Sequence, residues 1–189
     1  MRIDEAAGPY PGMLVTQDSA LERAFEQQVR ACSDLAIRVA FSVLRQREDA
    51  EEVAQEAFAR ANARFRELRD PEHFRGWLVR VTWRLAIDRW RSDRRRQSRE
   101  QNANESSAGV SAEQLAVDAE RAARLWTAVD GLPEKLRIVV VLSALEGHDV
   151  AEVARLLAIP EGTVKSRLFL ARKALAQRLT CLANDSAKR

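Results

Sequence analysis

Residue types that could carry out catalysis are few and scattered along this chain of 189 residues. His73 and His148 are its only histidines, and neither belongs to a recognisable set of partner residues. Cys32 and Cys181 are far apart, without a CxxC pair or a second ligand, so no zinc site is expected. Hydrolysis or group transfer needs paired carboxylates at a metal, or a nucleophile activated by a base. We therefore predict no enzymatic activity, no metal and no cofactor.

The last third of the chain instead carries residues suited to binding a polyanion. Asp149 followed by Glu152 is typical of a capping box at a helix start, and residues 159–162 (IPEG) indicate a turn. Two short helices joined by a tight turn, the second rich in cations, are the pattern of a helix-turn-helix. The second helix would enter a DNA major groove about 12 Å wide. The residues predicted to contact phosphates and base edges are Thr163, Lys165, Ser166, Arg167, Arg172 and Lys173.

Thr163 has a second predicted role in this motif. It stands where the final helix is expected to begin, so it would cap that helix and help its backbone amides hold a phosphate. A helical hairpin in an ordinary bundle would show a similar pattern, so the motif alone does not decide the function.

Charge is distributed unevenly in the first half of the chain. Five acidic residues and no basic residue occur between Glu48 and Glu56. From Arg60 to Arg99 there are thirteen arginines and five acidic residues. An acidic patch followed by a basic stretch indicates two different partners, although solvated helix faces would also account for any single charge. The net charge of +3 adds only a weak indication of a polyanionic partner.

Apolar periodicity predicts an all-α fold. Apolar residues recur at steps of three and four from Leu21 onward, and helices are expected over 48–66 and 74–91. Residues 93–112 contain almost no large apolar side chain, which predicts a flexible linker. Helical patterning resumes from Leu115, with Gly147 as a stop signal. Trp77, Trp83 and Trp90 are predicted to lie in the core and are not assigned to stacking on bases. Trp77 is the strongest core candidate.

These patterns divide the chain into two small helical domains, the second one a helix-turn-helix. The predicted divisions are a flexible N-terminal tail over 1–20, a first domain over 21–94, a linker over 95–118, a second domain over 119–182 and a tail over 183–189. No signal peptide and no membrane-spanning segment are expected, because the N-terminus lacks an apolar region and the longest apolar run is short.

Several segments of the chain resemble one known family, and they occur along the chain in the order typical of that family. Residues 149–175 (DVAEVARLLAIPEGTVKSRLFLARKAL), preceded by LPE at 132–134, resemble the promoter-reading domain of extracytoplasmic-function sigma factors. Residues 49–58 (DAEEVAQEAF) resemble that family's polymerase-binding helix. Residues 74–78 (FRGWL), with IDR at 87–89, resemble its helix for the downstream promoter element. The resemblance covers residues 21–92 and 119–180.

The resemblance implies a factor that binds core bacterial RNA polymerase and directs promoter recognition, DNA melting and initiation. It implies a cytoplasmic location, and an anti-sigma factor as a partner wedged between the two domains. The implied polymerase-binding residues are Asp49, Glu51, Glu52, Gln55 and Glu56. The implied contacts to downstream promoter DNA are Arg69, His73, Phe74, Arg75, Arg80, Arg84 and Arg91. Upstream promoter DNA would be read by the six residues from Thr163 to Lys173 given above.

The sequence departs from the family pattern at three places. His148 and Asp149 stand where many members have an aromatic residue, and Phe169 stands where an Arg or His is frequent. Arg84 occupies a position where Asn is common, and because Arg cannot accept a hydrogen bond, it is expected to contact phosphate.

Two other classes of function remain open. A helix-turn-helix regulator that never touches polymerase explains the last third equally well, but it leaves the acidic and Trp-rich helices without a role. An enzyme acting on nucleic acid, such as a recombinase, is disfavoured because the chain lacks a recognisable catalytic set.

Overall fold

The computed structural model describes residues 12–68, 70–101 and 113–186, and the regular structure in these ranges is entirely helical. The predicted all-α class is therefore confirmed. The elements are α1 (Gly12–Leu44), α2 (Arg47–Ala63), α3 (Pro71–Gln101), α4 (Glu113–Asp130), α5 (Glu134–Val140), the π-helical turn η1 (Val141–Leu145), α6 (Val150–Leu157) and α7 (Glu161–Ser186).

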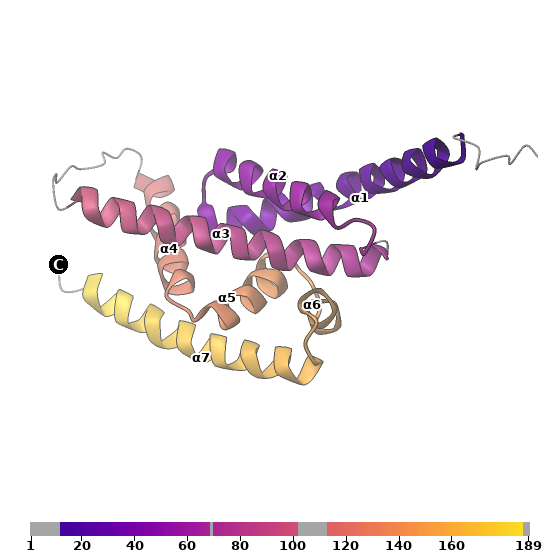
Figure 1. The fold of residues 1–189 in the computed structure, drawn as a ribbon. Coiled ribbons are helices and arrows are strands. Elements are labelled where there is room, and N and C mark those ends of the chain that lie inside the picture. The colour runs from indigo at the N-terminus through magenta and orange to yellow at the C-terminus, as the bar shows by residue number, and fades with distance from the viewer. Residues whose placement is uncertain (1–11, 69, 102–112, 187–189) are drawn as a thin grey trace, which may run out of the picture.

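Helices α1, α2 and α3 form the first half of the molecule and pack on one another (Figure 1). Apolar residues at helical spacing point inward from all three, because each helix can bury only one stripe. At one end of this bundle Phe25, Phe65 and Phe74 make three edge-to-face contacts, with ring centroids 5.1 to 6.3 Å apart. Edge-to-face pairs are a favoured aromatic geometry, so this cluster fixes where α3 starts relative to α1.

Helices α4 to α7 form the second half. Gly147 adopts a φ of +73° after η1, which is a backbone conformation that glycine reaches without a steric cost. Ala158 ends α6 in the left-handed region with a φ of 54°. The chain then turns at Pro160 and enters α7, so α6 and α7 make the expected helix-turn-helix.

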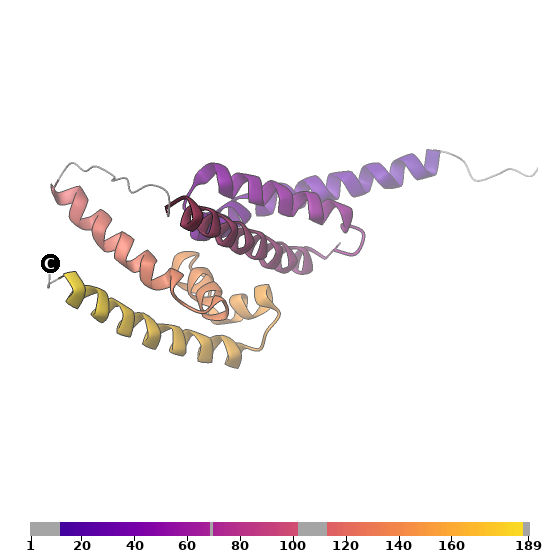
Figure 2. The ribbon, with the colours of Figure 1, turned by 60° about the vertical axis from the view of Figure 1, so that its left-hand side comes forward.

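The two halves pack against each other through one continuous apolar core. Figures 1 and 2 show α5 and α6 against the side of α3 that faces away from α2. Buried residues from both halves belong to the same cluster, including Val39 of α1, Val79 and Trp83 of α3, Leu142 of η1 and Val153 of α6. The halves are thus in direct apolar contact.

Three helices are longer than the sequence predicted. α1 begins at Gly12, ahead of the expected Leu21, because no Gly or Pro interrupts residues 13–44. α3 continues to Gln101 because residues 93–101 are mostly good helix formers, and a polar helix can extend into solvent when packing anchors its first turns. α4 begins at Glu113. Helices therefore occupy both ends of the expected linker, and its middle, residues 102–112, lies outside the described residues.

The tryptophans also differ from expectation in their order of burial. Trp83 is 3% exposed and lies in the core. Trp77 and Trp90 are half-buried and pack against the edges of the two main apolar clusters. Trp77, the strongest sequence candidate, is therefore less buried than Trp83.

Candidate nucleic-acid and protein interfaces

Helix α2 presents the predicted acidic residues, and each carboxylate among them already has a cationic neighbour. Glu51 pairs with Arg47 at 2.7 Å and Glu56 with Arg60 at 2.6 Å, both as exposed pairs one turn apart. Asp49 and Glu52 both pair with Arg89 of α3. Gln55 is exposed between them. The acidic surface is therefore partly neutralised by the protein itself.

Arg89 is a residue that sequence reasoning assigned no role. Its guanidinium joins α3 to the first turns of α2, and the hydrogen bond to Glu52 raises the pKa of Arg89. The only sequence signal was the IDR segment at 87–89, which does not reveal which carboxylates the arginine meets.

The predicted downstream-DNA residues differ in exposure and in their partners. His73 and Arg84 are exposed, and Arg69 lies outside the described residues. Arg75 and Arg80 are half-buried against α6, and Arg91 is exposed but pairs with Glu134 at 3.0 Å. Burial lowers the pKa of Arg80. Three of the predicted cations, Arg75, Arg80 and Arg91, are thus engaged by the second half of the protein.

Phe74 lies in the first turn of α3 and not at its exposed surface. The side chain of Asp70 accepts hydrogen bonds from the backbone amides of Glu72 and His73, at 2.8 and 3.2 Å. It therefore caps a helix whose first residue is Pro71, a favoured first position for proline. Phe74 follows in the first turn and points inward, where its side chain is 0% exposed.

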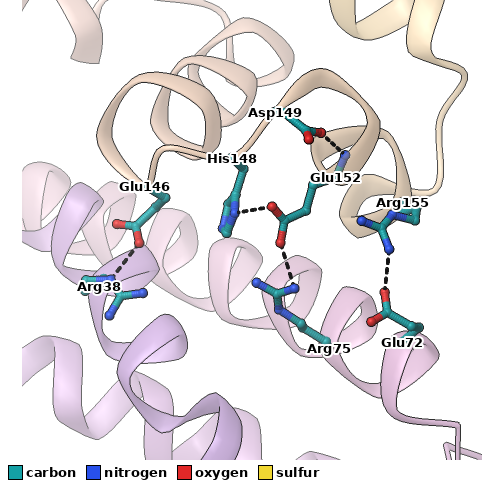
Figure 3. A network of polar contacts seen from close by, with 8 residues as sticks. All are labelled: Arg38, Glu72, Arg75, Glu146, His148, Asp149, Glu152 and Arg155. Carbon is teal, nitrogen blue, oxygen red and sulfur yellow. Dashed lines mark hydrogen bonds and ion pairs between the residues drawn. The ribbon is translucent and has the colours of Figure 1, made fainter.

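The predicted capping box at the start of α6 is half formed. Asp149 Oδ1 accepts a hydrogen bond from the backbone amide of Glu152 at 2.7 Å, as the motif requires. The Glu152 side chain does not complete the box. Its carboxylate pairs with His148 at 2.9 Å and with Arg75 at 2.7 Å (Figure 3).

Helix α7 presents most of the predicted upstream-DNA residues to solvent. Lys165, Ser166, Arg172 and Lys173 are exposed, and Arg167 is half-buried. Thr163 is not the cap of this helix, because α7 already begins at Glu161. Pro160 directly precedes the helix, and its carbonyl accepts hydrogen bonds from the amides of Thr163 and Val164. Thr163 therefore lies inside the first turn.

A polar network crosses between the two halves beside α6. Arg38 of α1 lies 2.6 Å from Glu146, and Glu72 of α3 lies 3.3 Å from Arg155 (Figure 3). Between these outer pairs lies the Arg75–Glu152 pair. Burial alone would raise the pKa of Glu152, but hydrogen bonds from His148 and Arg75 outweigh it and lower that pKa.

A second, more buried charge cluster lies where α1 meets α4 and α5. Asp130 accepts a hydrogen bond from Arg45 at 3.2 Å and lies 3.6 Å from Arg137. The guanidinium of Arg45 stacks 3.3 Å above the ring of Trp126, and that of Arg137 lies 5.1 Å from Trp90. Burial lowers the pKa of Arg45 to about 10 and raises that of Asp130. Sequence reasoning missed this cluster, because its members lie on α3, α4, α5 and the turn that follows α1.

The described residues form neither a metal-binding cluster nor a membrane-spanning helix. They include no group of three or more His, Cys, Asp or Glu side chains placed to hold a metal ion. Among the helices described, none is both long and apolar enough to cross a membrane.

Two segments of the chain match known family patterns. Residues 28–96 match the family described as Sigma-70 region 2, and residues 122–175 match Sigma-70, region 4. The first covers the second half of α1, all of α2 and the basic part of α3. The second covers the second half of α4, the helix-turn-helix and the cationic part of α7.

Three relatives are similar over most of this chain. The ECF RNA polymerase sigma factor SigE of Mycolicibacterium smegmatis is 33% identical over 180 residues, which are 92% of this chain and 68% of that protein. The probable RNA polymerase sigma factor RfaY of Xanthomonas campestris is 32% identical, over 88% of this chain and 44% of that protein. The ECF RNA polymerase sigma factor SigW of Bacillus subtilis is 29% identical, over 82% of this chain and 89% of that protein.

Two solved structures have a similar fold. CnrH in complex with the cytosolic domain of CnrY matches with a TM-score of 0.59 and 24% identity, over 85% of this chain and 90% of that one. The sigma factor RpoE in complex with the anti-sigma factor NepR from Bartonella quintana matches with a TM-score of 0.51 and 22% identity, over 82% and 96%.

Proposed function

The chain belongs to the extracytoplasmic-function (ECF) RNA polymerase sigma factors, and on this premise we propose how its parts share the work of initiation. Residues 21–94 form the domain that binds core polymerase and the downstream promoter element. Residues 119–182 form the domain that reads the upstream element. The residues between these domains connect them. Helices α3 and α4 extend into this segment from either side, and α1 and α7 extend into the expected tails as far as Gly12 and Ser186.

The acidic face of α2 is the polymerase-docking surface in this proposal. Its members are Asp49, Glu51, Glu52, Gln55 and Glu56. Glu51, Glu52 and Glu56 have side chains 41 to 62% exposed, so a cationic surface on polymerase can reach them. Charge complementarity of this kind mainly sets the association rate and the orientation of the complex. Arg89 then acts as a positioning residue, because it holds two of these carboxylates in place.

The basic face of α3 is the proposed surface for the downstream element. Arg84 and His73 are exposed and can reach a DNA strand without a rearrangement of the protein. Arg75, Arg80 and Arg91 lie along the same helix and extend this surface once their present partners are released. Cations along a groove bind a single strand mainly through its phosphates, so the contribution is strongly salt-dependent.

The cations of α7 are the proposed surface for the upstream element. Lys165, Ser166, Arg172 and Lys173 point into solvent from a helix that follows a tight turn, which is the arrangement that places a helix in a major groove. Arg167 is the proposed base-reading residue, since arginine is the commonest side chain in specific contacts to guanine. Thr163 remains close to the start of α7 and contributes to phosphate binding there.

Sigma factors as a family are not catalysts, and we extend this to the present chain by proposing no enzymatic activity of its own. We propose that it acts in the cytoplasm, where bacterial polymerase and promoters meet. An anti-sigma factor is the proposed inhibitory partner. Support comes from the solved complex of the sigma factor RpoE with the anti-sigma factor NepR. RpoE has a fold similar to that of this chain.

The observation that carries this proposal is the presence, in one chain, of an exposed acidic helix and an exposed cationic recognition helix. A simple regulator needs only the second. The test measures the affinity of the purified chain for core polymerase, using Glu51→Lys/Glu56→Lys as the variant. Both residues form exposed pairs one turn apart, which contribute only about 0.3–0.5 kcal/mol each to stability. The fold should therefore survive.

Glu22→Lys/Glu26→Lys is the matched control, because both residues are exposed on α1 outside the docking face and the change in net charge is the same. We expect binding of the parent chain and of this control, and a clear loss for the double variant. Equal binding of all three proteins would remove α2 from the interface. Tight duplex binding by a dimer, without polymerase association, would instead support the simple regulator.

A further inference from the structure

Helix α7 exposes a phenylalanine in the middle of its cationic face. Phe169 is 68% exposed, which is the largest fraction among the exposed large apolar residues of the part of the chain that is described. Neighbours on the surface of a helix lie three and four positions away. The exposed residues at these positions are Lys165, Ser166, Arg172 and Lys173. Side chains of the proposed upstream-DNA surface therefore surround the ring.

The opposite side of α7 holds the helix in the fold without this ring. Val164, Leu168 and Ala171 are buried and belong to apolar clusters that join α7 to other helices. Phe169 is in none of the apolar clusters that the described residues form. Packing within the chain therefore does not account for a phenylalanine at this position.

The place of Phe169 along α7 suits the centre of a major groove. From Lys165 to Lys173 the helix rises by about 12 Å, which is about the width of the groove, and Phe169 lies midway. The stretch lies in the first part of α7, which begins at Glu161. In a helix-turn-helix this part of the second helix contacts base edges. Cations at both ends of the stretch can then reach phosphates while the ring faces the bases.

A phenyl ring in the major groove has one apolar partner among the base edges, the C5-methyl group of thymine. The other groups exposed there are hydrogen-bond donors and acceptors, with which the ring cannot pair. Contact with the methyl group removes apolar surface of both partners from water, and this favours binding. The chemistry of Phe169 therefore matches a T·A base pair.

A protein partner fits the surroundings of Phe169 less well. The cores of protein interfaces are depleted of charged residues, and of lysine and serine in particular. Lys165, Ser166 and Lys173 are of these types and lie next to the ring on the helix surface. DNA offers phosphates to the cations and a methyl group to the ring, so it satisfies both at once.

We infer that Phe169 reads a thymine of the upstream promoter element by packing its ring against the C5-methyl group. This inference rests on the proposed function of α7. Phe169 stands where an Arg or His is frequent in the family, so the contact belongs to the promoter preference of this particular chain. Because phenylalanine cannot donate a hydrogen bond to guanine, a T·A pair is expected at the base pair that it meets.

Deoxyuridine tests the inference, because a U·A pair differs from a T·A pair only by the missing methyl group. Duplexes that carry an upstream element are first selected from a randomised pool with the complex of the full chain and core polymerase. Each thymine of the selected element is then replaced singly by deoxyuridine, and the Kd of the complex for each duplex is measured. At one thymine the affinity should fall by about fourfold, the effect expected for one buried methyl group.

Phe169→Ala should weaken binding to the thymine duplex by about tenfold and should bind the thymine and deoxyuridine duplexes equally. The fold should survive, because the residue is exposed and alanine favours a helix. Leu170→Ala is the matched control. Leu170 is 51% exposed but lies about 100° further round the helix, beside the half-buried Arg167 and Ala174, so this variant should keep the preference for thymine.

Arg172→Ala gives a second comparison, because loss of a phosphate contact should weaken the thymine and deoxyuridine duplexes alike. The inference is overturned if no deoxyuridine weakens binding by the parent chain, if Phe169→Ala keeps the preference, or if Leu170→Ala loses it. A Phe169→Ala variant impaired only in polymerase binding would assign the ring to a protein contact instead. A parent chain that selects no duplex together with polymerase would overturn the proposed function itself.

Discussion

Nη1 of Arg89 on α3 donates to Oε2 of Glu52 on α2 at 2.6 Å, so the basic helix is tied directly to the acidic one. The same guanidinium reaches Asp49. Arg89 therefore sets the orientation of two carboxylates on the proposed docking face. It also lowers the net negative charge that this face presents to polymerase.

Replacing Arg89 by Ala should lower the free energy of unfolding by about 0.5–1 kcal/mol, because the pairs are partly exposed and surface ion pairs contribute little. Arg60→Ala removes only the exposed pair with Glu56 inside α2 and should cost less. Urea unfolding followed by circular dichroism measures both. Equal costs for the two variants would contradict the link between α2 and α3.

Replacing Asp130 by Asn should destabilise the protein more strongly, by about 1–3 kcal/mol, since it leaves the half-buried Arg45 and the buried Arg137 without a full counter-charge. The matched control is Asp88→Asn, because Asp88 is exposed and lies 3.9 Å from its partner Arg91. Thermal unfolding of both variants gives the comparison. A control as destabilised as Asp130→Asn would show that the buried cluster has no special role.

The stability of the folded protein should depend on pH through Glu152, which joins the two halves through Arg75. Its pKa is lowered below the ordinary value of 4.5, so its contribution to stability is complete above that pH. The contribution is then lost as the pH falls through the lowered pKa, when the carboxylate takes up a proton. Unfolding midpoints measured from pH 6 to about pH 3 test this. Glu152→Gln should reduce the slope in this acidic range, and an unchanged slope would contradict the assignment.

Replacing Arg167 by Ala should cost about 1–3 kcal/mol of promoter affinity and relax specificity at one base pair. Lys165→Ala is the comparison, because the exposed Lys165 is suited to a phosphate contact and its loss should weaken all sequences alike. Binding to a set of single-base promoter variants separates the two effects. Uniform weakening by Arg167→Ala would remove the base contact.

Local features of the fold were predictable from the sequence. The apolar spacing, the stop at Gly147 and the cap at Asp149 each act over a few residues, so they can be recognised without a structure. The start of α3 was also predictable from the sequence. Asp70 followed by Pro71 is a cap followed by a favoured first helical residue, although the apolar spacing alone predicted a helix start at residue 74.

Contacts between the halves were not predictable in the same way. Arg75 and Glu152 are far apart in sequence, and no periodicity indicates that their helices meet. The same holds for Arg45 and Asp130. The charges themselves were visible, but an arginine beside DNA and an arginine beside a carboxylate look alike in sequence. Only the packing shows that α3 currently uses several of its cations internally.

Promoter-dependent transcription with purified core polymerase tests the central claim most directly. The parent chain should start transcripts at a defined position on promoter-bearing fragments, and Glu51→Lys/Glu52→Lys should abolish them while helix content is retained. Transcripts that persist in this variant would contradict the acidic docking helix. Duplex binding by the parent chain without any polymerase-dependent transcript would contradict the assignment of the whole chain as an initiation factor.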